Sequence, residues 1–213
     1  MFPEIVRDDI FRLETRRLWL RWPTLADADP IDSFCNHSHV PHAMVQPLQH
    51  GAAAKTVAAI ANWRIEMQAG TALHLVIAPK AGERQPIGAI HLVPGRSGLI
   101  ELDYRLHPDS RGQGLMTEAA QAVLDTAFML GAVSQVGASP LVVDSAGRRV
   151  LERCGFTFVG TGMSICRFGI GLMACDHFCL DRKTWHSLKS WNLPDFGARL
   201  TTQGHPCVAT IPG

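Results

Sequence analysis

The chain has 213 residues, with 20 Lys and Arg against 19 Asp and Glu, and a formal net charge of +1. This length is typical of one domain with a full core, and the charge balance gives no general attraction to nucleic acid or to an anionic membrane. No segment approaches the ~20 apolar residues of a membrane-spanning helix, and Glu4, Asp8 and Asp9 interrupt any apolar run near Met1. We therefore expect a cytoplasmic protein with no nucleic-acid or membrane partner.

The first predicted elements are a strand and a short helix. Residues 17–22 alternate in polarity, which is typical of a half-buried strand. Its apolar face holds Leu18, Leu20 and Trp22. Thr24, with Asp27 three residues later, has the spacing of a helix cap. The segment 37–42 then carries three histidines, which could bind a metal or line an acceptor pocket, although a solvated loop is the simpler interpretation.

The middle of the chain predicts one helix and three strands. Apolar residues recur at helical spacing over residues 52–68, and Gly70 ends the pattern. The apolar side chains of this helix are Val57, Ile60, Ala61 and Ile65. The strands that follow are predicted at 73–78, 87–93 and 99–107, with a hairpin loop at 80–84 between the first two.

The strand at 99–107 carries two carboxylates on one face. Its period of two places Glu101 and Asp103 together with Arg105. The opposite face holds Leu102, Tyr104 and Leu106. A carboxylate at this place could act as a base, or it could simply pair with Arg105 on a polar face.

A glycine-bearing loop, Arg111-Gly112-Gln113-Gly114, separates that strand from a helix predicted to run through Leu130. Helix starts leave backbone N–H groups unpaired and carry partial positive charge, so they favour bound phosphate. The two glycines allow positive φ and close approach of a ligand, and Arg111 can add a charged contact. The simpler interpretation is a tight turn between strand and helix.

The remaining elements are a broken strand, a helix and two further strands. Residues 133–143 predict a strand interrupted by Gly137 and Pro140. Asp144 or Ser145 can cap the next helix, which is expected to run to Cys154 and stop at Gly155. The last strands are predicted at 156–159 and 172–180.

The six cysteines match neither a short secreted framework nor paired Cys-x-x-Cys motifs, so reduced thiols are expected. Cys175, His177 and Cys179 would share one strand face, but zinc needs a fourth ligand, for which Cys166 is only a guess. We prefer a packed strand and expect no metal.

Several of these segments resemble one enzyme family. The glycine-bearing loop at 111–114, together with Leu115 and Met116, resembles the acetyl-CoA signature of the GNAT superfamily of N-acyltransferases. The segment from Met116 to Ala119 resembles the RimJ/RimL branch of that superfamily. Further similar segments occur in the branch's order, at residues 13–21, 86–88, 148–156 and 180–185.

The resemblance covers residues 13–185, and residues 186–213 are expected to form a C-terminal extension. It implies an α/β (α+β) fold, in which a mixed, mostly antiparallel central sheet is flanked by helices. Acetyl-CoA, the acyl-donor cosubstrate, would lie in a cleft between two splayed strands. The residues that it implies for the cofactor are Leu106, Arg111, Gly112, Gln113, Gly114, Leu115, Met116, Thr117 and Asp144.

The chemistry that the resemblance implies is acetyl transfer to a primary amine, either a protein N-terminus or a small molecule, by a monomer or homodimer. The amine must lose a proton, and Glu101 matches the strand position from which many members supply a base. Asp144 and Gly147 depart from the family's Asn-x-x-Ser, so Ser145 or a water would have to supply the proton donor. The alternative is an acyl-CoA-binding module without efficient turnover.

The residues that select the acceptor are expected between positions 35 and 51 and between 161 and 171.

Overall fold

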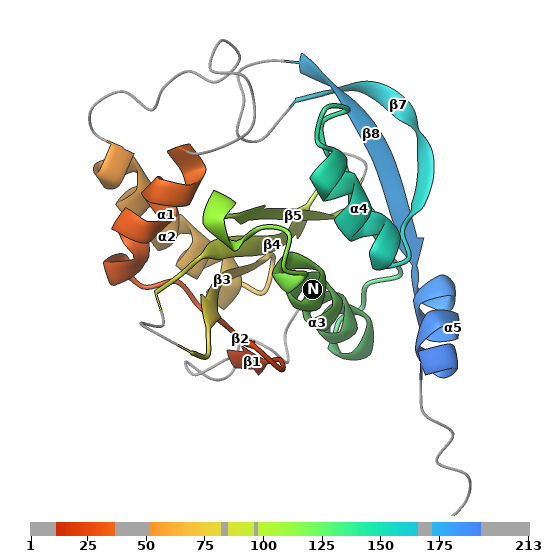
Figure 1. Cartoon of the computed structure of the whole chain (residues 1–213), viewed down its shortest axis with the longest axis horizontal. Coiled ribbons are helices and arrows are strands. Elements are labelled where there is room, and N and C mark those ends of the chain that lie inside the picture. Colours follow the sequence, from red (N-terminus) through yellow and green to blue (C-terminus); the bar gives the residue numbers. More distant parts are fainter. Residues whose placement is uncertain (1–11, 37–51, 82–84, 96–97, 166–171, 193–213) are drawn as a thin grey trace, which may run out of the picture.

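The computed structural model describes residues 12–36, 52–81, 85–95, 98–165 and 172–192. Within these ranges eight strands form one sheet in the order β1-β2-β3-β4-β5-β6-β8-β7 (Figure 1). The strands are β1 (Arg12–Glu14), β2 (Leu18–Arg21), β3 (Leu73–Pro79), β4 (Gly88–Pro94), β5 (Ile100–Leu106), β6 (Gln135–Ala138), β7 (Thr157–Ile165) and β8 (Leu172–Asp181). Neighbouring strands are antiparallel except β5 and β6, which confirms the predicted mixed sheet.

Five helices in the described part of the chain flank the sheet. They are α1 (Ala28–Asn36), α2 (Ala52–Gln68), α3 (Leu115–Leu130), α4 (Ser145–Arg153) and α5 (Arg182–Asn192). Short 3-10 turns at Leu25–Asp27 and Pro108–Ser110 precede α1 and α3. Within the described ranges, no helix could span a membrane. The histidine segment 37–42, Cys166 and residues 193–213 lie outside the described residues.

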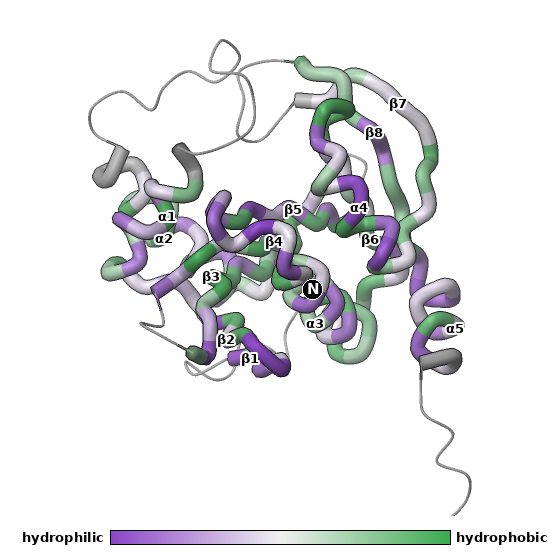
Figure 2. Tube along the Cα trace, in the orientation of Figure 1, coloured by the Kyte–Doolittle hydropathy of each residue, from purple (hydrophilic) through white to green (hydrophobic). Residues whose placement is uncertain are grey.

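Two hydrophobic clusters lie on opposite faces of the sheet. The larger packs α3 against alternate residues of β3, β4 and β5, including Leu75, Ile90 and Leu102. The smaller packs α1 and α2 against Val76 and Ala89 on the other face. Figure 1 shows α1 and α2 together on one side of the strands and α3 on the other, and Figure 2 shows the mainly hydrophobic character of β3 between them.

The helix at 52–68 forms with the predicted bounds, but its buried face differs from the predicted one. Val57 and Ile65 are 39% and 62% exposed, whereas Ile60 and Met67 are fully buried. Thr56, also buried, and half-buried Trp63 complete the buried stripe. The 4-3-4 spacing of these four residues is helical. Val57, Ala61 and Ile65 form a second apolar stripe, and the position of the sheet decided which one was buried.

The predicted alternation of β2 is confirmed, and the capping residues after it take part in a partly buried ion pair. Leu18 and Leu20 are fully buried. Arg21 donates two hydrogen bonds of 2.7 Å to the Asp27 carboxylate, which also accepts hydrogen bonds from Thr24 N–H (2.7 Å) and its hydroxyl (2.9 Å). Asp27 thus fixes the turn that leads from β2 into α1.

The later elements form near their predicted positions. Of the segment 133–143 only Gln135–Ala138 is a strand, and Leu141 makes an isolated bridge to Cys175. Asp144 caps α4 by accepting the Gly147 N–H at 2.8 Å, as predicted. The last strands are longer than predicted, because β7 and β8 pair from Thr157 with Cys179 to Ile165 with Leu172.

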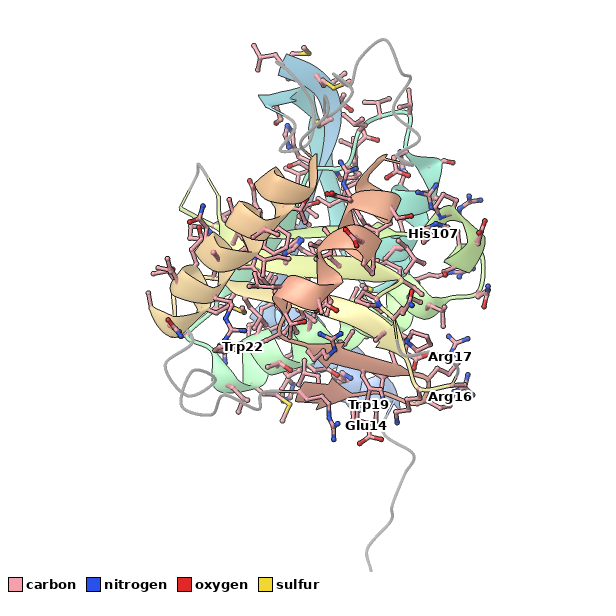
Figure 3. The ribbon with its side chains drawn as sticks, turned by 90° about the vertical axis from the view of Figure 1, so that its left-hand side faces the viewer. Glu14, Arg16, Arg17, Trp19, Trp22 and His107 are labelled. Carbon is pink, nitrogen blue, oxygen red and sulfur yellow. The ribbon has the colours of Figure 1, made fainter. Side chains whose placement is uncertain are left out.

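The carboxylate of Glu118, on α3, connects the segment before β2 to the region of the glycine-bearing loop. Its Oε1 accepts hydrogen bonds from the Thr15 hydroxyl (2.6 Å) and the Arg17 N–H (2.8 Å), and its Oε2 accepts one from Arg17 Nε (2.7 Å). The same Arg17 side chain donates to the carbonyl of Gln113 at 2.9 Å. Figure 3 shows Arg17 on the same edge of the molecule as His107, which follows β5.

Glu118→Gln should lower the free energy of unfolding by about 2 kcal/mol at pH 7, because a charged acceptor of several hydrogen bonds is lost. Burial would raise the pKa of Glu118, but the hydrogen bonds from Thr15 and Arg17 outweigh burial and lower the pKa from 4.5. The stabilisation is therefore complete above pH 4.5 and is lost as the pH falls through the lowered pKa.

Urea unfolding of both proteins between pH 3 and 7 measures this difference. Glu152→Gln is the control, because Glu152 forms an exposed pair with Arg148 on α4 and should contribute less than ~1 kcal/mol. Equal stability losses in the two variants at pH 7 would contradict the role of Glu118.

Candidate active site

The central feature of the site is the point where β5 and β6 part. The two parallel strands pair at Ile100 with Val136 and at Glu101 with Gly137, and the pairing then ends. β5 continues to Leu106 along β4, while β6 pairs with β8. Backbone groups of β5 that point toward β6 beyond Glu101 therefore have no partner on that strand. This is the splayed arrangement of strands that the family resemblance implies.

The glycine-bearing loop joins the end of β5 to α3 with the predicted backbone conformation. Gly112 and Gly114 have φ values of 74° and 73°, which side-chain-bearing residues rarely adopt. Gly114 is the N-cap of α3, and the amide of Glu118 closes the helix onto its carbonyl at 3.1 Å. The amides of Leu115 to Thr117 point out of the helix start, where they can bind an anion.

Arg111 is held in the same loop with part of its charge unsatisfied. Its Nε donates to the carbonyl of Leu106 at 3.1 Å. One terminal nitrogen is buried and has no partner among the described residues. Burial lowers the pKa of Arg111, the nearby charge of Asp144 opposes this, and that of Arg105 adds to it. A buried guanidinium nitrogen without an acceptor fits a site that receives a bound anion.

The other residues predicted to contact the cofactor lie in or beside this loop and differ in how far their side chains are buried. Leu106, Leu115 and Met116 are buried in the core beside α3, so only their backbone groups are placed for a polar ligand. Gln113 turns its side chain back to the carbonyl of Asp109 at 3.3 Å. Thr117 is half-buried in the first turn of α3.

Glu101 and Asp103 lie on the sheet face toward α1 and α2, opposite the buried Leu102. Both are half-buried. Glu101 is at the apex of the opening, because it is the last residue of β5 that pairs with β6. A Cβ on Gly95 would lie 2.7 Å from its carboxylate, so this glycine leaves the space that the Glu101 side chain occupies. Asp103 is the next residue on the same face and lies beyond the end of the pairing.

Asp144 and Gly147, which depart from the family's pattern, are matched to each other. A Cβ on Gly147 would lie 2.4 Å from Asp144 Oδ2, so the carboxylate fills the space that a serine side chain would need. The negative charge of Asp144 acts on Arg111 of the loop, where it opposes the lowering of the pKa by burial. Ser145 is exposed at the first residue of α4.

Tyr104 connects the two sides of the opening, a role that the sequence does not suggest. Its hydroxyl donates a hydrogen bond of 2.8 Å to the carbonyl of Gly147, which joins β5 to the start of α4. Burial first, and then the charge of Asp144, raises the pKa of Tyr104 well above its usual value. The hydroxyl therefore stays protonated and holds α4 in place.

The metal hypotheses gain no support within the described ranges, which contain no cluster of three His, Cys, Asp or Glu able to hold an ion. His177 instead pairs through Nδ1 with the Ser139 hydroxyl at 3.0 Å. Cys154, Cys175 and Cys179 are free thiols, and burial, with a contribution from Asp125, raises the pKa of Cys154 to about 12.

Solved structures with the same fold include several acetyltransferases. The ribosomal-protein-S5-alanine acetyltransferase from Vibrio fischeri is 17% identical, with a TM-score of 0.68 over 82% of this chain and 98% of that one. The Microcin C7 self immunity acetyltransferase MccE, in complex with acetyl-CoA and AMP, is 18% identical, with a TM-score of 0.66 over 78% and 93%. RimL, the ribosomal L7/L12 alpha-N-protein acetyltransferase in complex with coenzyme A, is 17% identical, with a TM-score of 0.65 over 78% and 95%.

Similarities at this level of identity establish the fold. No protein of curated function matches the sequence significantly. The model of the acetyltransferase (GNAT) domain, however, matches residues 17–157, which is more than half of the chain. The matched segment contains the parting of β5 and β6, the glycine-bearing loop and α4. The chain therefore belongs to the acetyltransferase (GNAT) family.

Proposed function

We propose that this protein transfers the acetyl group of acetyl-CoA to a primary amine, either a protein N-terminus or a small molecule. The observation that carries the proposal is the loop from Arg111 to Gly114, with two positive-φ glycines at a helix start and a buried guanidinium nitrogen that has no partner in the described part of the chain. These features fit the phosphates of a coenzyme A thioester. The complexes of MccE with acetyl-CoA and RimL with coenzyme A support the same ligand.

The residues proposed to hold the cofactor are the loop, the first amides of α3 and Asp144. The glycines and the amides of Leu115 to Thr117 would surround the phosphates, and Arg111 would add a charged contact. Bound acetyl-CoA supplies an activated acetyl group as a thioester. Arg17 and Glu118 support this arrangement from behind the loop, because they hold the Gln113 carbonyl and the N-terminal end of α3.

We propose Glu101 as the group that takes the proton of the attacking amine. Amines are mostly protonated at neutral pH, with α-amino groups near ~8 and lysines above ~10, so a base accelerates their attack. Glu101 stands where the strands part, on the face toward α1 and α2. A β5 amide without a β6 partner could stabilise the negative charge that develops on the thioester oxygen.

A binding module without turnover is the second candidate, and Gly147 is the observation that favours it. A glycine there offers no hydroxyl to protonate the departing thiolate, and Asp144 occupies the space. We favour the enzyme, because a thiol with a pKa near ~8.5 can leave without a strong acid. Ser145 is the proposed donor where one is needed.

Arg111→Ala should weaken acetyl-CoA binding roughly tenfold or more, the expected value of a hydrogen bond to a charged group. Gly114→Val should weaken it as well, because a β-branched residue strongly disfavours φ near 73°. Isothermal titration calorimetry measures both. Arg153→Ala, an exposed arginine at the end of α4, is the control, and wild-type affinity in both loop variants would contradict the proposed phosphate site.

The reaction itself is tested by the release of free coenzyme A thiol from acetyl-CoA across N-terminal peptides, polyamines, amino acids and amino sugars. Release with one acceptor class, lost in the Arg111→Ala, Gly114→Val double variant, is the expected result. Glu101→Gln should lower kcat roughly 10²-fold or more. A wild-type rate and pH profile in Glu101→Gln would remove Glu101 as the base. No release from a protein that binds acetyl-CoA would favour the binding module.

Ser145→Ala should lower kcat by less than tenfold, because a good leaving thiolate needs little help from an acid. Ser190→Ala provides a matched control on α5, where the serine hydroxyl donates only to the carbonyl of His186. Steady-state kinetics with the best acceptor measure the effect. Identical rates in the two variants would show that water, rather than Ser145, protonates the thiolate.

A further inference from the structure

A serine and a histidine form a hydrogen-bonded pair on the sheet face that carries Glu101. Ser139 directly follows β6, and its hydroxyl lies 3.0 Å from Nδ1 of His177 on β8. The two residues face each other because the register that pairs Ala138 with Phe178 continues by one residue beyond β6. Ser139 is exposed and His177 is half-buried. The pair is therefore open to a ligand from solvent.

The register of three strands places this pair beside the proposed base. Gly137 of β6 is the partner of Glu101 on one side and of Cys179 of β8 on the other. Because side chains alternate along a strand, Ser139 and His177, each two residues away from these partners, lie on the same face. Strands lie ~4.8 Å apart and rise ~3.3 Å per residue, which puts the Cα atoms of Ser139 and Glu101 roughly 8 Å apart. A small acceptor can span this separation.

Two glycines of β7 leave room around the imidazole of His177. Gly160 is the direct partner of His177, and Gly162 is the next residue on the same face. A Cβ on Gly162 would lie 3.0 Å from His177 Nε2, whereas a Cβ on Gly160 would meet no atom of the described residues within 4 Å. The Nε2 edge of the ring thus lies above a residue that has no side chain.

Within the described residues, the imidazole of His177 has no carboxylate partner on β6, β7 or β8. Neither β6 nor β7 contains an acidic residue. Asp176 of β8 lies on the opposite face, where it accepts a hydrogen bond of 2.7 Å from Thr161 and pairs with Arg148. Asp181 ends β8 and accepts hydrogen bonds from α5. An anionic group of a ligand would supply the partner that these strands do not provide.

A serine hydroxyl beside an imidazole is suited to such a group. When the ring is protonated, its Nδ1–H donates to the serine oxygen, and the Nε2–H and the serine O–H both remain as donors. A carboxylate or a phosphate offers acceptor oxygens for both, and hydrogen bonds to ionised groups are stronger than those between neutral groups. The carboxylate of Glu101 on the same face suits the other end of the ligand, its amine.

We propose that Ser139 and His177 bind an anionic group, a carboxylate or a phosphate, on the acceptor whose amine reacts at Glu101. The inference rests on the proposed function, because it names the chemical class of that acceptor. It adds two acceptor-binding residues outside positions 35–51 and 161–171, where the sequence predicts them. The pair holds the acceptor and takes no proton from its amine, which remains the role of Glu101.

Paired acceptors that differ by one charge test this subsite. The pairs are γ-aminobutyrate with its amide, aminoethyl phosphate with aminoethanol, and two peptides that begin Ala-Glu or Ala-Gln. In at least one pair the charged acceptor should have a kcat/KM roughly tenfold higher, the expected value of a hydrogen bond to a charged group. That pair identifies the source of the anion. Ratios near one in every pair would overturn the proposal.

His177→Gln should reduce this ratio to near one, because the amide cannot become charged. Ser139→Ala should reduce it in part. Comparison of the same pair across variants cancels the intrinsic reactivity of each amine. His186→Gln, which changes an exposed histidine of α5, is the control and should keep the wild-type ratio. The wild-type ratio in His177→Gln would overturn the subsite while the acetyl transfer remained.

The two glycines of β7 supply a matched pair of variants. Gly162→Ala crowds Nε2 of His177 and should lower the ratio. Gly160→Ala adds its methyl group where no described atom lies within 4 Å and should leave the ratio unchanged. Equal losses in the two variants would contradict a ligand held at the Nε2 edge.

Absence of turnover with every acceptor would contradict the proposed function, and a binding measurement then tests the subsite alone. Histidine ring NMR of the intact protein should show the His177 signal, identified by its loss in His177→Gln, shifting with the charged member of one pair. The neutral member should cause no comparable shift. Equal responses to both members of every pair would overturn the anion subsite.

Discussion

The parting of β5 and β6 after two paired residues is the constraint on which the rest of the site depends. It leaves backbone groups of β5 without a strand partner, and buried groups of this kind need another acceptor or donor. The loop and α3 connect these two parallel strands. The loop therefore lies at the end of β5 where the strands separate. The opening between the strands is therefore a consequence of the sheet's pairing rather than of any single side chain.

Two sets of hydrogen bonds hold the elements around this opening in place. Tyr104 joins β5 to the carbonyl of Gly147 at the start of α4. Behind the loop, Glu118 binds Thr15 and Arg17, and Arg17 binds the Gln113 carbonyl. The family-like segments around residues 15–17 and 116–119 thus have a common physical role, since their side chains meet although about a hundred residues separate them.

The departures from the family's pattern are also explained by local contacts. Asp144 caps α4 and occupies the space above Gly147, so the two residues depart together. The fold retains the glycine-bearing loop and the parting of β5 and β6 with this change. A proton donor is the least demanding part of thioester chemistry, whereas proton removal from an amine is essential. Glu101, the proposed base on the α1 and α2 side of the sheet, would meet that second need.

The family resemblance implied the mixed sheet, and the residues themselves determined most elements, the caps at Thr24 and Asp144, and the loop with Gly112 and Gly114. These features rest on local periodicity and backbone conformation, which neighbouring residues carry. Only the tertiary structure decided which stripe of α2 is buried, since that helix carries apolar residues on two sides. It alone brought Ser139 and His177 together, because cross-strand register joins residues that no local pattern relates. The same is true of Glu118 and Arg17, whose contact depends on the packing of α3 against β2.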